Sequence, residues 1–147
     1  MNIPGLRSPY VKTGGILYFA RMIDKVRLHD RGELPRDYLG NLGVASDGLC
    51  LNFLWIEYPA FTERVKQGGT DEEILEWAFQ QGRKPSAEEI HIWNEYNRKR
   101  GWNDELSARL KQRKVESGLE ERDDIQVFYD YIDVDEGREP GSKSLGF

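Results

Sequence analysis

Three successive segments in the second half of the chain carry complete helix-boundary signals, and these constrain the fold more than any other feature. The segment TDEEILEWAFQQG opens with Thr70 and Glu73, which form a capping box when each side chain binds the other's free backbone N–H. The segment SAEEIHIWNEYNRKRG repeats this arrangement with Ser86 and Glu89, and NDELSARLKQRKVESG opens on Asn103 with two acidic residues in its first turn. Because each segment ends at a glycine, we predict three helices of defined length.

The remaining segments are also helical in character, with weaker boundary signals. The stretch DGLCLNFLW is apolar on every side, which predicts a buried helix and leaves a buried strand as the alternative. No segment alternates between apolar and polar residues cleanly enough to require a sheet. The further helical segments that we expect are residues 15–30, one turn after Pro35, residues 47–55, residues 59–67 and residues 123–135.

These patterns predict an all-α fold, a compact orthogonal bundle of six or seven helices. A chain of 147 residues has the length of one domain and can bury a hydrophobic core without disulfides or metals. We expect this single domain to span residues 1–136. Residues 137–147, GREPGSKSLGF, are rich in glycine and polar residues and predict a flexible tail.

Charge and cysteine content argue against several classes of protein. The chain has 21 basic and 26 acidic residues, whereas a general nucleic-acid-binding domain is expected to be strongly basic. A single cysteine cannot form an intramolecular disulfide, which is typical of a reducing compartment. Prolines and glycines interrupt the start of the chain where a signal peptide needs an apolar run, and no apolar stretch approaches the ~20 residues that span a bilayer. We therefore expect a cytoplasmic protein that binds neither membranes nor nucleic acid.

Seven segments of the chain form a recognisable pattern: LRSPY, GGILYFARMIDKVRLH, GELPRDY, GGTDEEILEWAF, RKPSAEEIHIWNEY, RKRGWNDE and RDDIQVFYDYIDVDEGR. Together they resemble a small bacterial domain family of unknown function, over nearly the whole chain. The resemblance implies an all-helical, single-domain bacterial protein, and it implies no activity, ligand or site residue. One position departs from the pattern, because Trp55 follows NFL where a glycine is expected.

The helix expected over residues 15–30 places one arginine, Arg27, inside its apolar face. A helix turns by ~100° per residue, which gathers residues such as Phe19 and Ile23 into one arc with Arg27 among them. Apolar residues also occur on the opposite face, which predicts a central helix. Because an unpaired buried charge is costly, we predict that Arg27 anchors the following connection through Asp37, Asp47 or loop carbonyls.

The same helix offers an alternative hypothesis, an anion-binding or ligand-binding site. Guanidinium and ammonium groups bind carboxylates and phosphates, and a histidine beside them titrates near neutral pH. The connection after the helix would add a carboxylate and a phenol. The candidate ligand-binding residues are Arg21, Asp24, Lys25, Arg27, His29, Asp37 and Tyr38.

The sequence contains no complete catalytic or metal-binding constellation. Cys50 lies in an apolar setting that raises the pKa of a thiol and keeps it inert. Glu88, His91 and Glu95 share one arc of a helix, but a di-iron bundle site needs a second such motif, so we interpret them as a solvated face. We expect no metal and no cofactor, and we assign no catalytic residues.

Charge is segregated near the end of the chain. Residues 98–114 carry seven basic and two acidic side chains, and residues 120–139 carry nine acidic and two basic ones. We interpret this as two neighbouring segments whose charges largely cancel, each exposed pair contributing ~0–1 kcal/mol. The alternative is that one face is free to meet a charged partner.

The absence of a catalytic constellation and the segregated charge favour a non-catalytic protein-interaction or regulatory module that binds another protein. The alternative function is a small-molecule-binding or anion-binding protein, or an enzyme, with a polar site around Arg21, Asp24, Arg27 and His29. A cleft that reaches this helix would favour the second function, and a closed, well-packed helix would favour the first.

Overall fold

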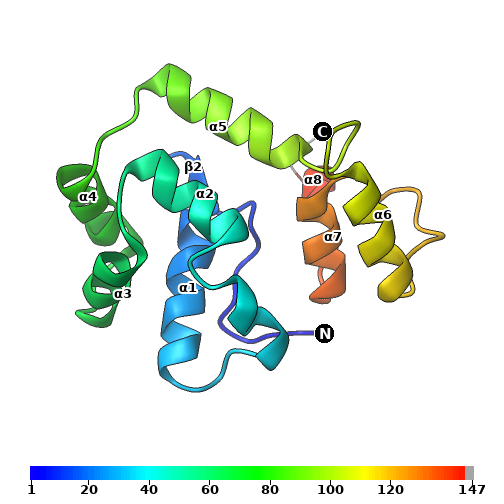
Figure 1. Ribbon diagram of the computed structural model, residues 1–147, viewed down its shortest axis with the longest axis horizontal. Helices are drawn as coiled ribbons and strands as arrows, with labels where there is room; N and C mark the ends of the chain where they lie inside the picture. Colours follow the sequence, from blue (N-terminus) through cyan, green and yellow to red (C-terminus); the bar gives the residue numbers. More distant parts are fainter. Residues whose placement is uncertain (145–147) are drawn as a thin grey trace.

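Helix α1 (Phe19–Asp30) lies at the centre of the molecule (Figure 1), and nine of its twelve residues are buried. The structure is a computed structural model and describes residues 1–144. Helices α2 (Ala45–Leu54), α3 (Tyr58–Lys66) and α4 (Asp71–Gln81) share one hydrophobic core with α1. The prediction of a central helix is therefore confirmed, and the apolar stretch around Cys50 forms a helix rather than a strand.

A short hairpin precedes α1, which the sequence analysis missed. Strand β1 (Lys12–Thr13) pairs antiparallel with β2 (Ile16–Leu17). The two residues between them, Gly14 and Gly15, both have positive φ, as a two-residue type I′ turn requires. The predicted helix start at Gly15 is therefore wrong, and the helix begins four residues later at Phe19.

Both predicted capping boxes are present. At the start of α4, the backbone N–H of Glu73 donates to the Thr70 hydroxyl and that of Thr70 donates to the Glu73 carboxylate, each at 3.1 Å. Helix α5 (Ala87–Lys99) begins in the same way, with Ser86 and Glu89 as the reciprocal pair. These local signals fix two helix starts because they satisfy backbone groups that no neighbouring helix can reach.

The third predicted helix begins later than expected. Helix α6 is Ser107–Glu116, four residues after Asn103, which adopts a left-handed backbone with φ of 50°. The carboxylate of Asp104 accepts hydrogen bonds from the backbone N–H groups of Gly101 and Leu106 at 2.9 and 2.8 Å. Asp104 therefore stabilises a turn before the helix instead of the first turn within it.

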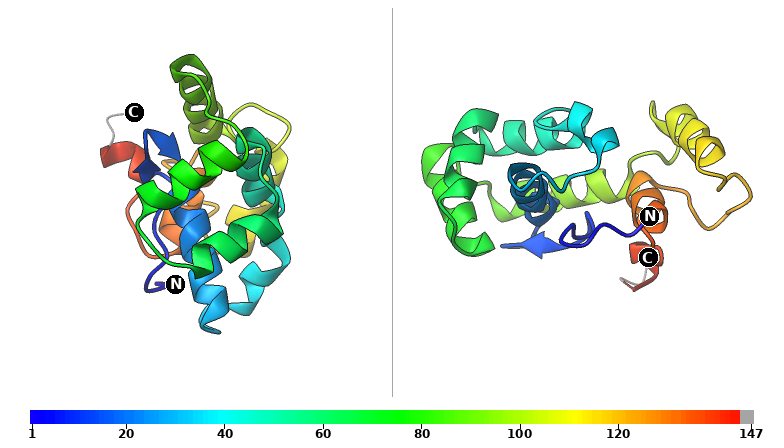
Figure 2. Two further views of the ribbon diagram at one scale, coloured as in Figure 1. Left: turned by 90° about the vertical axis from the view of Figure 1, so that its left-hand side faces the viewer. Right: turned by 90° about the horizontal axis from the view of Figure 1, so that it is seen from below.

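The second half of the chain packs partly on the main hydrophobic core, through Trp93 and Tyr129, and partly around a smaller cluster. Helix α5 runs from α4 towards α6 and α7 (Phe128–Asp135), which lie side by side (Figures 1 and 2). Leu110, Ile125 and Tyr131 form this smaller hydrophobic cluster. The last long helix begins at Phe128 rather than at the predicted residue 123. With the 3-10 helix η1 (Arg36–Asn41) at the predicted turn after Pro35, these elements confirm the all-α fold class.

The turn after α2 has an unusual residue at its left-handed position. Trp55 has φ of 61° and ends α2 where a glycine avoids steric cost. Its ring is 68% exposed, and the Arg83 guanidinium lies 5.0 Å from the ring centroid. Gly82 lies against the same turn. A side chain does not fit there, because a Cβ would lie 2.0 Å from the carbonyl oxygen of Leu54.

The chain beyond residue 136 contacts the domain. The backbone N–H of Gly141 donates to the Asp133 carboxylate at 3.0 Å, and that of Ser142 donates to Asp130 at 3.1 Å. These two residues begin a short helix, α8 (Gly141–Ser144). The predicted flexible tail thus includes residues that pack beside α7, and residues 145–147 lie outside the part of the chain described.

Replacing Ser86 by alanine should reduce the free energy of unfolding by ~1 kcal/mol, because the backbone N–H of Glu89 loses its acceptor. Ser86→Asp is the matched control, since a carboxylate caps a helix as well as a hydroxyl does. Urea unfolding followed by circular dichroism measures both variants. Equal losses in the two variants would contradict the capping role.

Candidate functional site

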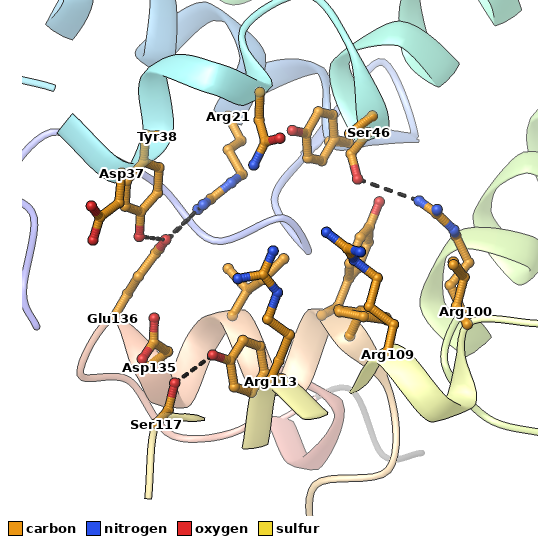
Figure 3. Close-up of a pocket in the computed structure, with 18 of the residues that line it drawn as sticks. Arg21, Asp37, Tyr38, Ser46, Arg100, Arg109, Arg113, Ser117, Asp135 and Glu136 are labelled. Atoms are coloured by element: carbon orange, nitrogen blue, oxygen red, sulfur yellow. Dashed lines mark hydrogen bonds and ion pairs between the residues drawn. The ribbon is translucent and has the colours of Figure 1, made fainter. Parts of the chain in front are cut away.

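A cleft of about 750 Å³ lies between the two halves of the molecule (Figure 3). Its first wall consists of α1, η1 and the first turn of α2. Its second wall consists of α6 and α7, and Arg100, which follows α5, lies at one end. The lining combines charged side chains with the rings of Tyr18, Tyr38, Tyr129 and Tyr131.

A buried ion pair joins the two walls. Arg21 in α1 donates from both terminal nitrogens to the two carboxylate oxygens of Glu136, at 2.8 and 2.6 Å. The two residues are 4% and 2% exposed. Glu136 also accepts hydrogen bonds from the Tyr38 hydroxyl at 2.7 Å and from Arg138 at 2.8 Å. A buried charge persists only when it is paired and hydrogen-bonded, so each group requires the others.

A second buried pair supports the first wall. Lys25 Nζ lies 2.9 Å from Asp47 Oδ1, and the Tyr18 hydroxyl donates to the same oxygen at 2.6 Å. The other Asp47 oxygen accepts from the backbone N–H of Gly43 at 3.0 Å. Burial lowers the pKa of Lys25 despite the opposing effect of the Asp47 charge. This pair ties α1 to α2 and leaves little net charge behind the cleft wall.

The opposite end of the cleft is basic. Figure 3 shows Arg109 and Arg113 extending from α6 into the cleft, with Arg100 beside the first turn of α2. Arg100 donates to the hydroxyl of Ser46 at 3.3 Å, and Arg113 forms a long 3.7 Å ion pair with Glu116. Arg109 is exposed, and its side chain makes no hydrogen bond or ion pair with any residue in 1–144.

Two buried hydrogen-bond donors that line this cleft have no partner among residues 1–144. The first is the hydroxyl of Tyr129, whose side chain is 1% exposed and whose ring packs against Tyr18 and Tyr10. The second is Nε of Arg100. Burial raises the pKa of Tyr129, so its hydroxyl stays protonated. A buried group without a partner costs ~1–3 kcal/mol, so these two donors are unsatisfied positions beside the cleft.

Four of the seven residues proposed from the sequence line this cleft: Arg21, Lys25, Asp37 and Tyr38. Two of them, Arg21 and Lys25, are held by carboxylates of the protein itself. Asp37 is exposed at the rim, and the Tyr38 hydroxyl binds Glu136.

Asp24, Arg27 and His29 do not line the cleft. Asp24 accepts hydrogen bonds from Arg7 at 2.9 Å on another side of α1. Arg27 is half-buried, and its guanidinium donates at 2.9 Å to the carbonyl of Gly69. The loop-carbonyl anchor expected for Arg27 is therefore present, but it joins α1 to the α3–α4 connection rather than to the segment after α1. His29 is exposed beside a smaller hollow of about 530 Å³.

Helical periodicity assigned the buried position in α1 to Arg27, whereas the buried arginine is Arg21. Residues on the second face of α1, including Arg21, are buried because the amino-terminal segment and the end of α7 cover that face. A wheel records which residues share a face and contains no information about what covers the polar side.

Sequence reasoning missed five residues of the basic end: Ser46, Arg100, Arg109, Arg113 and Tyr129. The signal that would have found the arginines is the basic segment 98–114. The predicted packing of the two charged segments is present, through α6 and α7. Within it, Arg109 and Arg113 face the cleft, while Glu136 and Asp133 bind Arg138.

Within the described residues, no group of three or more histidine, cysteine, aspartate or glutamate side chains is arranged to hold a metal ion. Over the same residues, every helix is too short or too polar to cross a membrane.

The fold and the cleft together define a small helical protein with a polar, partly basic site. The model of a family described as Domain of unknown function (DUF5069) matches residues 3–138, and the chain belongs to this family. The predicted resemblance to a near full-length domain family of unknown function is thus confirmed. No curated protein matches the chain.

Replacing Glu136 by glutamine should reduce the free energy of unfolding by ~3–5 kcal/mol at pH 7, because Arg21 is left buried and unpaired. Burial alone would raise the pKa of Glu136, but Arg21, Tyr38 and Arg138 lower it below its ordinary value. The stabilisation is therefore present above the unfolded pKa of about 4.3 and is lost as the pH falls through the folded pKa.

The difference between wild type and Glu136→Gln should consequently shrink between pH 7 and pH 3, as measured by urea unfolding. Glu33→Gln is the matched control, because Glu33 pairs with Arg31 at 3.2 Å on the surface and contributes ~0–1 kcal/mol. A difference for Glu136→Gln that stays constant with pH would contradict the role of the buried carboxylate.

Replacing Tyr129 by phenylalanine should stabilise the free protein by up to about 1 kcal/mol, since it removes a buried hydroxyl without a partner. Tyr18→Phe is the matched control. It should destabilise by ~1–3 kcal/mol, because the Tyr18 hydroxyl is bound to Asp47. Thermal unfolding compares the two variants, and a loss of stability in Tyr129→Phe would show that its hydroxyl is satisfied.

Proposed function

We propose that this domain binds a small organic anion in the cleft, through Arg109 and Arg100. The observation that carries the proposal is the coincidence of an unpaired arginine with two buried donors that lack partners, the Tyr129 hydroxyl and Arg100 Nε. Protein interiors satisfy nearly all such groups, so their concentration at one end of a cleft favours a ligand that accepts hydrogen bonds.

The charges around the cleft support an anion rather than a neutral molecule. The basic end has three arginines, and Glu116 is the one carboxylate that pairs with them among residues 1–144. The other carboxylates of the cleft, Asp37, Asp135 and Glu136, lie at its far end (Figure 3). An anion at the arginine end therefore gains charge-assisted hydrogen bonds without meeting repulsion. A volume of about 750 Å³ lies within the range of small-molecule sites, ~300–1,000 Å³.

Anion binding is the alternative function predicted from the sequence, and the donors of the cleft favour it over the protein-interaction module. One observation favours the module as a second candidate: Ile92 and Tyr96 lie one turn apart on α5 and are 59% and 52% exposed. Native mass spectrometry of protein isolated from its own cells separates the two. A gain of a few hundred daltons that Arg109→Gln abolishes supports the ligand. A protein-sized gain that is lost in Ile92→Asp and kept in Arg109→Gln supports the module.

Anion binding is tested with benzoate and phenyl phosphate, which share a ring and differ in the charged group. At least one should raise the melting temperature of the wild-type protein saturably. Arg109→Gln should weaken that binding by roughly 10–100-fold, as expected for the loss of hydrogen bonds to a charged group. The variant's own stability should change by less than about 0.5 kcal/mol, since Arg109 is exposed and unpaired.

Lys111→Gln is the matched control, because Lys111 is an exposed cation on the same helix and does not line the cleft. It should bind the probe as tightly as the wild type, which separates a specific site from a general effect of net charge. Equal weakening in both variants, or saturable binding of neither probe, would overturn the proposal.

A further inference from the structure

We infer that the anionic group of the ligand is a phosphate ester, seated on the first turn of α2 between Arg100 and Arg109. This inference rests on the proposed function and specifies the chemistry of its ligand. It follows from the kinds of donor that meet at the basic end of the cleft and from the elements that carry them.

The first donors are backbone N–H groups at the start of α2. This helix has ten residues, and Val44 before it has no side chain that can cap it. The N–H groups of Ala45 and Ser46 make no hydrogen bond within the part of the chain that the structure describes. Both residues line the cleft, on the end of α2 that lies towards α7 (Figure 1). Free N–H groups and the positive end of the helix dipole together favour a bound anion.

Independent evidence for a ligand comes from the side chains around this turn. The Tyr129 side chain is 1% exposed, it lines the same cleft, and its hydroxyl has no partner among residues 1–144. Arg100 contacts the turn directly, through its 3.3 Å hydrogen bond to Ser46. Arg109 approaches from the opposite wall (Figure 3). Two donors near the start of α2, the Tyr129 hydroxyl and Arg100 Nε, thus have no acceptor among residues 1–144.

The arrangement suits a phosphate better than a carboxylate. A carboxylate presents two oxygens in one plane, whereas a phosphate ester presents three around a tetrahedral centre. Here the donors come from three elements: the start of α2 with the Ser46 hydroxyl, Arg100 after α5, and Arg109 of α6 across the cleft. Arginine forks and a helix start are the groups that proteins commonly combine around phosphate.

One carboxylate lies in the same helical turn, and its charge is already compensated. Asp47 is 1% exposed and is bound by Lys25 at 2.9 Å and by the Tyr18 hydroxyl at 2.6 Å. It therefore acts as part of a neutral buried pair and does not repel an anion at the mouth of the turn.

The rest of the cleft accommodates the organic part of the ester. Phe128, Tyr131 and Ile132 line the α7 side, and Tyr38 lines the opposite side. These side chains offer apolar surface beside the basic end. The cleft, at about 750 Å³, is much larger than a free phosphate ion requires.

The test compares phenyl phosphate with benzoate in nuclear magnetic resonance titrations of the full chain labelled with nitrogen-15. Phenyl phosphate should bind roughly ten-fold more tightly than benzoate, because it carries more charge and one more acceptor oxygen. The backbone amide protons of Ala45 and Ser46 should shift downfield on binding, as expected for new hydrogen bonds to an anion. Amides of the two well-capped helices, at Glu73 and Glu89, serve as internal controls and should not shift.

Ser46→Glu provides a second measurement. A carboxylate in the first turn of a helix is favoured by the helix dipole, so the variant should fold, and its side chain should occupy the site in place of the phosphate. Binding of phenyl phosphate should fall at least roughly ten-fold, whereas Ser46→Ala should lose only a few-fold.

The outcomes distinguish this inference from the function on which it rests. Equal binding of the two probes, or Arg109-dependent binding without shifts at Ala45 and Ser46, would overturn the phosphate site and leave anion binding in place. Saturable binding of neither probe would overturn both. Preferential binding of phenyl phosphate with shifts at both amides supports the inference.

Discussion

The bidentate contact between Arg21 and Glu136 is the constraint on which the rest of the structure depends. It connects the central helix to the end of α7, at sequence positions 115 residues apart, in surroundings from which water is excluded. Neither charge is tolerable alone, so the two halves of the molecule are held at a defined distance. This contact lies at one end of the cleft between the halves, and the three arginines of the basic end lie at the other.

The acidic and the basic segments of the chain have different roles in the structure. The carboxylates of the acidic segment, above all Asp130, Asp133 and Glu136, are used to hold the two ends of the chain and Arg21 in place. In the basic segment, by contrast, the Arg109 side chain makes no hydrogen bond or ion pair with any residue in 1–144. Two segments that appear complementary in the sequence thus serve different purposes, one internal support and the other a surface directed into the cleft.

Local signals in the sequence predicted the parts of the fold that local chemistry decides. The capping boxes at Thr70 and Ser86 and the turn after Pro35 need no distant partner, and all three are present. The hairpin before α1 was not predicted. Gly14 and Gly15 are a known turn signal, but each strand has only two residues and is too short to show alternation.

The site was predicted only in part for a related reason. Helical periodicity identified α1 as central but assigned Arg27, rather than Arg21, to a buried role. Arg21 is buried by the amino-terminal segment and by Glu136, which is 115 residues away, and the sequence pattern of α1 does not indicate either contact. The basic end combines Ser46, Arg100, Arg109 and Tyr129 from four separate elements. The tertiary fold brings these residues together, and their spacing along the chain does not predict this.

The smaller hydrophobic cluster in the second half has a consequence for how the molecule opens. The cluster consists of Leu110, Ile125 and Tyr131, and Ile132 packs against both it and the main core. Amide hydrogens of α6 should therefore exchange through local opening, at a lower free energy than global unfolding. A molecule that touches Arg109 on one wall and the start of α2 on the other would make that opening costlier. Occupancy of the cleft would then make the two halves unfold as a single cooperative unit.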